Sequence, residues 1–411
     1  MARIVQKYGG SSVASPEHIR NVAARIKKYH DNGDQMVVVV SAMGGVTDRL
    51  LTLVDEITQT PSEREVDMLL ATGEQQSVAL TAMALHDLGC PAISLTGAQA
   101  GIETDGVHSK ARIQNITPDL VEKHLETGHV VIVAGFQGRT EQDAITTLGR
   151  GGSDLTAVAL AAVLEADLCQ IYTDVEGVYT TDPRIVSDAR KIDEISFDEM
   201  LEMASLGAKV MQSRSIEFAK KFGVKLEVRS SLSDKPGTII TEETDDMEDV
   251  VVRGVSVDKK EAKLTLTHVP DTPGRAARAF GILADAAVNV DMIIQNVSEA
   301  GLTDLSFTVP QTEVKKIKHE LADRIKSDSG AENIEYDEAI AKVSVVGIGM
   351  RSHSGIAAAM FKALAAKEIN IEMISTSEIK VSCVIRLEQA DEAVRILHDT
   401  FGLGSENEQA A

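Results

Sequence analysis

A lysine stands between a short apolar strand and a run of small residues near the start of the chain, where residues 4–12 read IVQKYGGSS. The backbone N–H groups of Gly9 and Gly10 can turn toward a ligand, because glycine has no Cβ. The ammonium group of Lys7 is a point charge suited to a phosphate. The run matches neither the Walker A pattern nor the dinucleotide fingerprint G-x-G-x-x-G. It therefore predicts either a phosphate-binding corner or a plain turn beside an exposed lysine.

A second glycine-rich loop leads into an apolar helix, since residues 149–154 read GRGGSD and LTAVALA follows. Anions bind at helix N-termini, where N–H groups are free and the partial charge is positive. The planar guanidinium of Arg150 suits a carboxylate, and Asp154 can organise cationic groups or ligate Mg²⁺. The alternative interpretation is that Ser153 or Asp154 serves only as the N-cap of the helix. A cap, however, needs a single residue and does not explain the three glycines and the arginine.

A polar loop follows a short apolar strand, where residues 172–184 read YTDVEGVYTTDPR. Such a loop suits a nucleotide. The Tyr179 ring can contact the nucleotide, the carboxylates of Asp174 and Asp182 can accept hydrogen bonds from its hydroxyl groups, and Arg184 can contact a phosphate. A long polar surface loop is the alternative interpretation.

Glu74 ends the sequence LATGE, which we expect at or near the start of a helix. The local sequence favours a residue that only complements the helix dipole in the first turn. A carboxylate that binds a cationic amine is the second interpretation.

Apolar strands alternate with helices through the first half of the chain. Continuous apolar runs predict strands at 36–40, 91–95, 130–134 and 169–172, and helices are predicted at 15–30, 69–88 and 155–164. This alternation is typical of a parallel α/β sheet covered on both faces. Each strand ends in Gly, Ser, Thr or Asp, and ligands bind at the carboxyl ends of strands in such sheets.

The last third of the chain repeats itself after an acidic run at 242–249. With an offset of 81 residues, nine of the twenty residues from 274 to 293 recur, and each copy reads strand, helix, strand, strand. Two copies are too few for a solenoid. The repeat predicts two small α+β domains packed side by side.

Composition excludes several classes of protein. The chain has 411 residues, which predicts two or three domains, and a net charge of −22, which argues against a nucleic-acid partner. No apolar run is long enough for a membrane span, and no signal-peptide pattern is present. The three cysteines have no metal or disulfide spacing, so we expect a cytoplasmic protein.

Taken together, the motifs resemble those of the aspartate kinases in the amino acid kinase superfamily. They are KYGGSS at 7–12, VVVVSAMGGVTD at 37–48, ATGEQQS at 71–77, GRGGSD at 149–154 and YTDVEGVYTTDPR at 172–184, in family order. The doubled C-terminal segment resembles tandem ACT regulatory domains. The resemblance implies an αβα sandwich with the amino acid kinase fold at 1–245, then two ferredoxin-like ACT domains at 250–335 and 336–411. Tyr8 departs from the commoner phenylalanine of the first motif, which adds only a hydroxyl.

The resemblance also implies a reaction, in which ATP phosphorylates the β-carboxylate of L-aspartate at the entry to lysine, threonine and methionine synthesis. Lys7 and Asp154 are the implied catalytic residues, with ATP and Mg²⁺ as cofactors and no dedicated metal site. The implied nucleotide contacts are Lys7, Gly9, Gly10, Ser11, Thr173, Asp174, Tyr179, Asp182, Arg184 and Lys209. The implied aspartate contacts are Ser41, Thr47, Glu74, Arg150, Gly151, Gly152 and Ser153. Among them, Glu74 would bind the α-amine and Arg150 the α-carboxylate.

For the ACT pair, the resemblance implies feedback inhibition by lysine, threonine or both. The implied effector contacts are Asp271, Gly274, Ala276 and Gln295 in the first domain and Asn370, Ile371 and Thr376 in the second. The expected assembly is a homodimer, or an α2β2 complex with a shorter chain started internally at Met247.

Three rival interpretations remain open. One is a related kinase whose acceptor is glutamate or N-acetylglutamate, and the contexts of Glu74 and Arg150 argue against it. Another is a non-catalytic amino acid sensor, which the intact set of Lys7, Asp154 and GRGG disfavours. A third is a nicotinamide-linked enzyme, but no G-x-G-x-x-G follows the strands.

Overall fold

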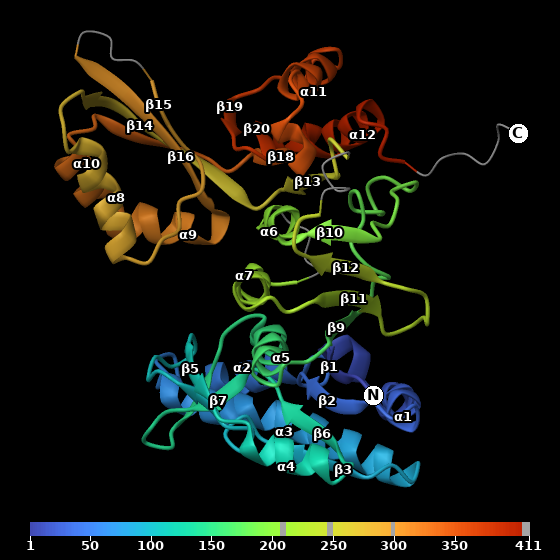
Figure 1. Ribbon diagram of the computed structural model, residues 1–411. Coiled ribbons are helices and arrows are strands. Elements are labelled where there is room, and N and C mark those ends of the chain that lie inside the picture. Colours follow the sequence, from blue (N-terminus) through green and yellow to red (C-terminus); the bar gives the residue numbers. More distant parts are fainter. Residues whose placement is uncertain (206–210, 245–249, 297–300, 405–411) are drawn as a thin grey trace, which may run out of the picture. The chain divides into compact units, whose positions relative to one another are not determined.

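The structure is a computed structural model that describes residues 1–205, 211–244, 250–296 and 301–404. The chain divides into two compact units (Figure 1). The first unit comprises residues 1–178, 191–205 and 209–247, and the second comprises residues 179–190, 206–208 and 248–411. The stretch 179–190 thus folds with the C-terminal part of the chain, although both of its sequence neighbours belong to the first unit.

An eight-stranded sheet forms the centre of the first unit, in the order β10-β12-β11-β9-β1-β2-β6-β3. The strands are β1 (Arg3–Tyr8), β2 (Gln35–Val40), β3 (Ala92–Leu95), β6 (Val130–Ala134), β9 (Leu168–Thr173), β10 (Glu194–Ser196), β11 (Leu226–Ser230) and β12 (Thr238–Thr241). All neighbours run parallel except β11 and β12. The predicted α/β class is confirmed, and β2, β3, β6 and β9 match the four predicted strands to within one residue.

Helices cover both faces of this sheet (Figure 1). They are α1 (Pro16–Asp31), α2 (Val46–Ile57), α3 (Glu63–Asp87), α4 (Asp119–Glu126), α5 (Gly152–Val163), α6 (Phe197–Ser205) and α7 (Ser213–Phe222). The first begins where its sequence predicts, because the Ser15 hydroxyl accepts a hydrogen bond from the His18 N–H at 3.3 Å and proline occupies the first helical position. Its apolar residues at 19, 22, 23 and 26 form one buried stripe.

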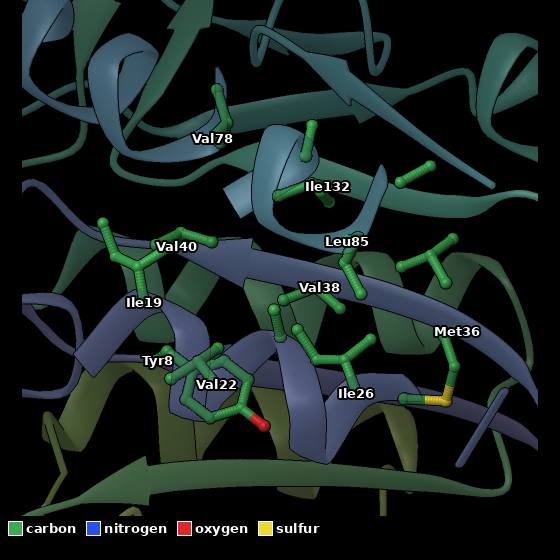
Figure 2. Packing of buried hydrophobic residues seen from close by; sticks show 14 of the residues in the cluster. Tyr8, Ile19, Val22, Ile26, Met36, Val38, Val40, Val78, Leu85 and Ile132 are labelled. Atoms are coloured by element: carbon green, nitrogen blue, oxygen red, sulfur yellow. The ribbon is translucent and has the colours of Figure 1, made fainter. Parts of the chain in front are cut away.

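The core between the sheet and α1 shows how the two faces are divided. Tyr8 packs with Ile19 and Val22 of α1 (Figure 2), whereas Lys7, the preceding residue of β1, contacts Asp154 of α5. Successive side chains of a strand point to opposite faces. The α1 side of the sheet is therefore a hydrophobic core, and the α5 side carries the charged pair.

A small second sheet, in the order β5-β4-β7-β8, completes the first unit. Its strands are β4 (Ile102–Thr104), β5 (Ile113–Ile116), β7 (Gln137–Arg139) and β8 (Ile145–Thr147). Strand β8 ends directly before the residues Leu148 and Gly149, so this sheet leads the chain into the GRGGSD loop.

The expected position of Glu74 at a helix start is wrong. Helix α3 begins at Glu63, so Glu74 lies in its middle and cannot be a first-turn dipole residue. Gly73, within the same LATGE sequence, is of a residue type that weakens helices. Here it is a helix-interior residue in a tight contact, since an added Cβ would lie 2.9 Å from the Cβ of Ala42.

The second unit contains two antiparallel four-stranded sheets, in the orders β15-β16-β14-β17 and β13-β18-β20-β19. The strands are β13 (Gly254–Asp258), β14 (Glu261–Pro270), β15 (Ile293–Gln295), β16 (Leu302–Pro310), β17 (Asn333–Asp337), β18 (Ile340–Val346), β19 (Met373–Thr376) and β20 (Lys380–Arg386). The helices are α8 (Arg275–Asp285), α9 (Gln311–Lys316), α10 (Ala322–Ser329), α11 (Ile356–Ala365) and α12 (Ala390–Thr400). The two predicted α+β domains are confirmed.

The two small domains are not consecutive in sequence. Strand β13 precedes the first repeat but pairs with β18 in the sheet of the second. The first sheet takes its last strand, β17, from the end of its own repeat and extends to Asp337. The predicted ranges 250–335 and 336–411 therefore differ from the sheet membership, because the first sheet takes all four of its strands from 261–337, whereas the second adds β13 to the three strands of its own repeat.

In the parts of the chain that the structure describes, no helix is both long and apolar enough to cross a membrane.

Candidate active site

Lys7 and Asp154 form an ion pair at the carboxyl end of β1, with the lysine Nζ 2.6 Å from the aspartate Oδ1. Their side chains are only 13% and 9% exposed. Asp154 lies in the first turn of α5, which begins after Gly151 with its φ of +72°. The structure thus joins two motifs that lie about 150 residues apart in the sequence, and it places a screened cation beside a helix N-terminus, where an anion is favoured.

Two glycine turns pack against each other next to this pair. The Gly44 N–H donates to the Gly10 carbonyl at 3.1 Å, and the Ser41 N–H donates to the Tyr8 carbonyl at 3.0 Å. A Cβ on Gly10 would lie 2.8 Å from the Ala42 carbonyl oxygen. The turns after β1 and β2 therefore lie side by side, and this close approach by itself requires glycine at position 10.

Ser153 is held against the end of β6. A Cβ on Gly135 would lie 2.7 Å from the Ser153 hydroxyl oxygen, and the Gly135 N–H donates to the Val40 carbonyl at 3.1 Å. The carboxyl ends of β1, β2 and β6 and the N-terminus of α5 thus meet at one edge of the sheet, where ligands bind in α/β proteins.

Glu74 contributes a buried carboxylate that is only half satisfied. The residue is 4% exposed; its Oε1 accepts a hydrogen bond from the Ala42 N–H at 3.1 Å, and its Oε2 has no hydrogen-bond partner. Burial raises the pKa of Glu74 to about 7, against the smaller opposing effect of the Ala42 hydrogen bond. A buried acceptor without a partner is costly, and a bound ammonium group would satisfy it.

The remaining predicted aspartate contacts lie in chain segments that adjoin these groups in the sequence. Arg150 is exposed in the loop before α5, with Gly151 and Gly152 after it, and Thr47 is half-buried in the first turn of α2.

The predicted nucleotide contacts fall in different parts of the chain. In the first unit, Thr173 is the last residue of β9 and Asp174 follows it, and the Thr173 hydroxyl donates a hydrogen bond to the Asp174 carboxylate at 3.0 Å. Tyr179, Asp182 and Arg184 belong to the second unit. There, hydrogen bonds from the Arg184 guanidinium, as short as 2.6 Å, lower the pKa of the Asp182 carboxyl. Lys209 lies outside the described residues.

The predicted effector contacts of the first ACT-like domain share one cavity of about 270 Å³. Asp271, Gly274, Ala276 and Gln295 all line it. Asn370, Ile371 and Thr376 do not line it, and they lie before and in β19 of the second domain.

Comparison with known proteins identifies the family. A family model described as "Amino acid kinase family" matches residues 2–230, and ACT domain models match residues 264–325 and 343–401. An aspartate kinase of Pseudomonas fluorescens (strain SBW25) is 54% identical over 406 residues, which cover 98% of each chain. The chain belongs to the aspartate kinase family.

Two crystal structures of E. coli aspartokinase III agree with this membership at 26% identity, each with 97% of this chain and 99% of that chain covered. The TM-score is 0.81 for the complex with aspartate and ADP (R-state) and 0.76 for the complex with lysine and aspartate (T-state). As a member of the family, the chain is an ATP-dependent kinase that acts on aspartate, with two ACT domains, and takes part in amino-acid biosynthesis. The predicted family is confirmed, and the predicted activity is confirmed as far as the name aspartate kinase describes it.

One buried carboxylate near the GRGGSD loop, that of Asp67, was not among the predicted residues. It lies on α3 and is fully buried among groups that surround the GRGGSD loop. A signal was present, because Asp67 precedes Glu74 by seven residues, which places both carboxylates on one face of a helix.

Proposed function

We propose that the chain transfers the γ-phosphoryl group of ATP to the β-carboxylate of L-aspartate and forms 4-phospho-L-aspartate, the first step toward lysine, threonine and methionine. The observation that carries this proposal is the shielded Lys7–Asp154 pair beside the glycine turns after β1 and β2. A nearby carboxylate with one unsatisfied oxygen, Glu74, supplies a site for the amine of the acceptor.

The chemistry requires little acid–base catalysis. The β-carboxylate of aspartate is already ionised at neutral pH and is itself the nucleophile. Catalysis is then mainly positioning and stabilisation of the charge on the transferred phosphoryl group. Lys7 and the N–H groups of Gly9 and Gly10 would hold the phosphates, while Asp154 orients the lysine ammonium toward them.

The acceptor would be held at both ends of its α-amino acid group. Glu74 would receive the ammonium group and Arg150 the α-carboxylate, which leaves the β-carboxylate free to face the phosphates. Ser41, Thr47 and Ser153, together with the N–H groups of Gly151 and Gly152, would line the remainder of the site.

The donor set fits Mg²⁺ that arrives with the nucleotide. Among the described residues, no group of three or more His, Cys, Asp or Glu side chains forms a metal site. Mg²⁺ commonly binds through one or two carboxylates plus substrate phosphates, and Asp154 is the available carboxylate. When bound, Mg²⁺ supplies neutralisation of phosphate charge. The nucleotide contacts proposed for Ser11, Thr173, Asp174, Tyr179, Asp182, Arg184 and Lys209 stay predictions.

We further propose feedback inhibition by lysine, threonine or both through the ACT domains. Support comes from the cavity that the four predicted contacts of the first domain share, and from the complex of the E. coli relative with lysine. Inhibition requires that the effector bind more tightly to a less active arrangement of the kinase. A homodimer or an α2β2 assembly stays a prediction, and its Met247 start lies outside the described residues.

A coupled ADP-release assay with Mg-ATP tests the proposal. ADP release should require L-aspartate, fail with N-acetylaspartate, whose amine has lost its charge, and fall on addition of lysine, threonine or both. Activity that persists without inhibition would retain the kinase and reject the effector proposal. Equal rates with aspartate and its N-acetyl derivative would reject the role of Glu74.

A further inference from the structure

We propose that Asp67 is a positioning residue for aspartate binding, because its buried carboxylate holds the chain segments against which the Arg150 loop is built. The inference rests on the proposed role of Arg150 as the clamp for the α-carboxylate. It assigns a function to a residue that does not touch the substrate.

Asp67 is 0% exposed and accepts hydrogen bonds from three different groups. The Thr147 hydroxyl donates to Oδ1 at 2.5 Å, the Ser109 N–H lies 3.1 and 3.0 Å from the two oxygens, and the His108 Nδ1 lies 2.7 Å from Oδ2. An ionised carboxylate only accepts hydrogen bonds and can receive all three, whereas an amide would turn an NH₂ group toward one of these donors. The charge and shape of Asp67 therefore match its surroundings.

Both segments that Asp67 holds lie against the start of the GRGGSD loop. Thr147 is the last residue of β8, two positions before Gly149. A Cβ on Gly149 would lie 3.1 Å from the Ser109 carbonyl oxygen, so this carbonyl borders the loop on its other side. The Ala111 N–H donates to the Thr147 carbonyl at 2.9 Å and ties the two segments together.

The backbone conformation of Ser109 indicates that surrounding contacts hold this segment in place. Its φ is +65°, in the left-handed region that non-glycine residues rarely adopt. Such a conformation persists where surrounding contacts determine it. Here the contact is the hydrogen bond between the Ser109 N–H and Asp67, which places the Ser109 carbonyl beside Gly149.

Helix α3 makes two further contacts on the same face as its contact through Asp67. Glu74 accepts from the Ala42 N–H, the Ala71 carbonyl accepts from the Gln137 Nε2 at 2.9 Å, and Asp67 holds Thr147 and Ser109. Three positions, at 67, 71 and 74, lie on one helix face. The helix that presents the proposed amine ligand thus also sets the position of the loop with the proposed α-carboxylate ligand.

The test replaces the hydroxyl that Asp67 binds. Thr147→Val should raise the aspartate KM about tenfold, since a small misplacement of a binding group has large kinetic effects, and should leave the ATP KM within about twofold. Thr147→Ser retains the hydroxyl and should restore the wild-type value. Thr146→Val is the matched control, because Thr146 is the buried neighbour in β8 whose hydroxyl instead pairs with Thr104 at 2.6 Å.

Two results would overturn the inference: an aspartate KM of Thr147→Val no higher than that of Thr146→Val, or a parallel rise in both KM values. Asp67→Asn should show the same selective rise as Thr147→Val, with circular dichroism confirming that it is folded. If Asp67→Asn does not fold, the Thr147 series alone decides.

Arg150→Gln separates this inference from the proposed function. An aspartate KM that Arg150→Gln leaves unchanged would refute the clamp and the Asp67 inference with it. A raised KM in Arg150→Gln together with a normal KM in Thr147→Val would refute only the inference.

Discussion

The buried carboxylate of Glu74 is unfavourably solvated in the free enzyme, and binding of the substrate amine in the proposed reaction would relieve this. Its carboxylate is buried, one oxygen lacks a partner, and its pKa is raised to about 7 by loss of solvation. Such perturbed groups concentrate at functional sites. The α-amine of aspartate would be both the missing hydrogen-bond donor and the missing countercharge.

A pH dependence follows from this pKa. The carboxyl of the free enzyme is neutral below about pH 7 and ionised above it, so kcat/KM for aspartate should fall as the pH drops below about 7. Glu74→Gln should raise the aspartate KM, leave the ATP KM nearly unchanged and remove this limb of the profile. Steady-state kinetics between pH 6 and 8.5 measure it. If kcat/KM of Glu74→Gln still fell below about pH 7 as in the wild type, the assignment of this pH dependence to Glu74 would be wrong.

The same group predicts an effect on stability. The pKa of Glu74 is higher in the folded chain than its ordinary value of 4.5, so its stabilising contribution is complete below pH 4.5 and lost as the pH rises through about 7. Glu74→Gln should therefore be more stable than wild type at pH 8, and the difference should shrink at pH 6. Thermal unfolding at the two pH values measures it, and a variant that is less stable at pH 8 would contradict the prediction.

Lys7 should have the largest single effect on catalysis. Lys7→Ala removes the charge proposed to stabilise the transferred phosphoryl group. The activation free energy should therefore rise by roughly 3–5 kcal/mol, which lowers kcat by about two to four orders of magnitude. Lys225→Ala is the control, since Lys225 is exposed at the opposite end of the same sheet, before β11. A near-normal kcat in Lys7→Ala would remove Lys7 from the mechanism.

At the level of elements, α3 is the scaffold of the site. It runs for 25 residues and approaches the turn after β2 closely at Gly73, where an added Cβ would lie 2.9 Å from Ala42. Glycine normally weakens a helix, so its presence here is explained by this contact. The contact brings the Glu74 carboxylate within reach of the Ala42 N–H.

Gly73→Ala tests this packing. The added methyl should destabilise the first unit by about 1–3 kcal/mol through overpacking and should raise the aspartate KM by displacing Glu74. Gly281→Ala is the matched control, because Gly281 is also inside a helix but has nothing within 4 Å of the added Cβ; it should stabilise by about 0.5–1 kcal/mol. Thermal unfolding and KM measurements compare the two, and equal effects would refute the packing argument.

On the scale of the whole molecule, the two ACT domains form a pair with internal two-fold character. Lys263 of the first domain pairs with Glu372 of the second, and Lys342 of the second pairs with Asp291 of the first. Asp291 and Glu372 are equivalent in the repeat, 81 residues apart. Apolar residues on both sides, including Met292 and Met373, pack in the same cluster. The repeat in the sequence thus corresponds to an interface in space.

The effector proposal is tested in this pair. Gln295→Ala should leave kcat unchanged and weaken inhibition several-fold, because Gln295 lines the cavity of the first domain. Inhibition curves with lysine and threonine, alone and together, measure it. Thr376→Ala at the equivalent position of the second domain shows whether both domains bind effector. Inhibition unaltered in Gln295→Ala would refute the role of that residue.

Much of this protein could be read from local patterns. Apolar runs predicted β2, β3, β6 and β9 closely, and the 81-residue repeat predicted the paired domains. The motifs identified the family, and the structure brings Lys7 and Asp154 together as their proposed roles require. These features were accessible because strand and helix periodicity, glycine turns and repeats are properties of consecutive residues.

Other features depend on contacts between residues far apart in the chain, and no local pattern contains them. Glu74 reaches the Ala42 N–H because Gly73 packs closely against Ala42, and Asp67 holds two distant segments because Thr147 and Ser109 converge on it. Strand β13 joins the second ACT sheet, and residues 179–190 fold with the C-terminal unit, where the Val255 N–H donates to the Thr180 carbonyl at 2.7 Å. Each of these features depends on burial and on hydrogen-bond partners that exist only once distant segments have packed together. Local patterns of consecutive residues do not specify that packing.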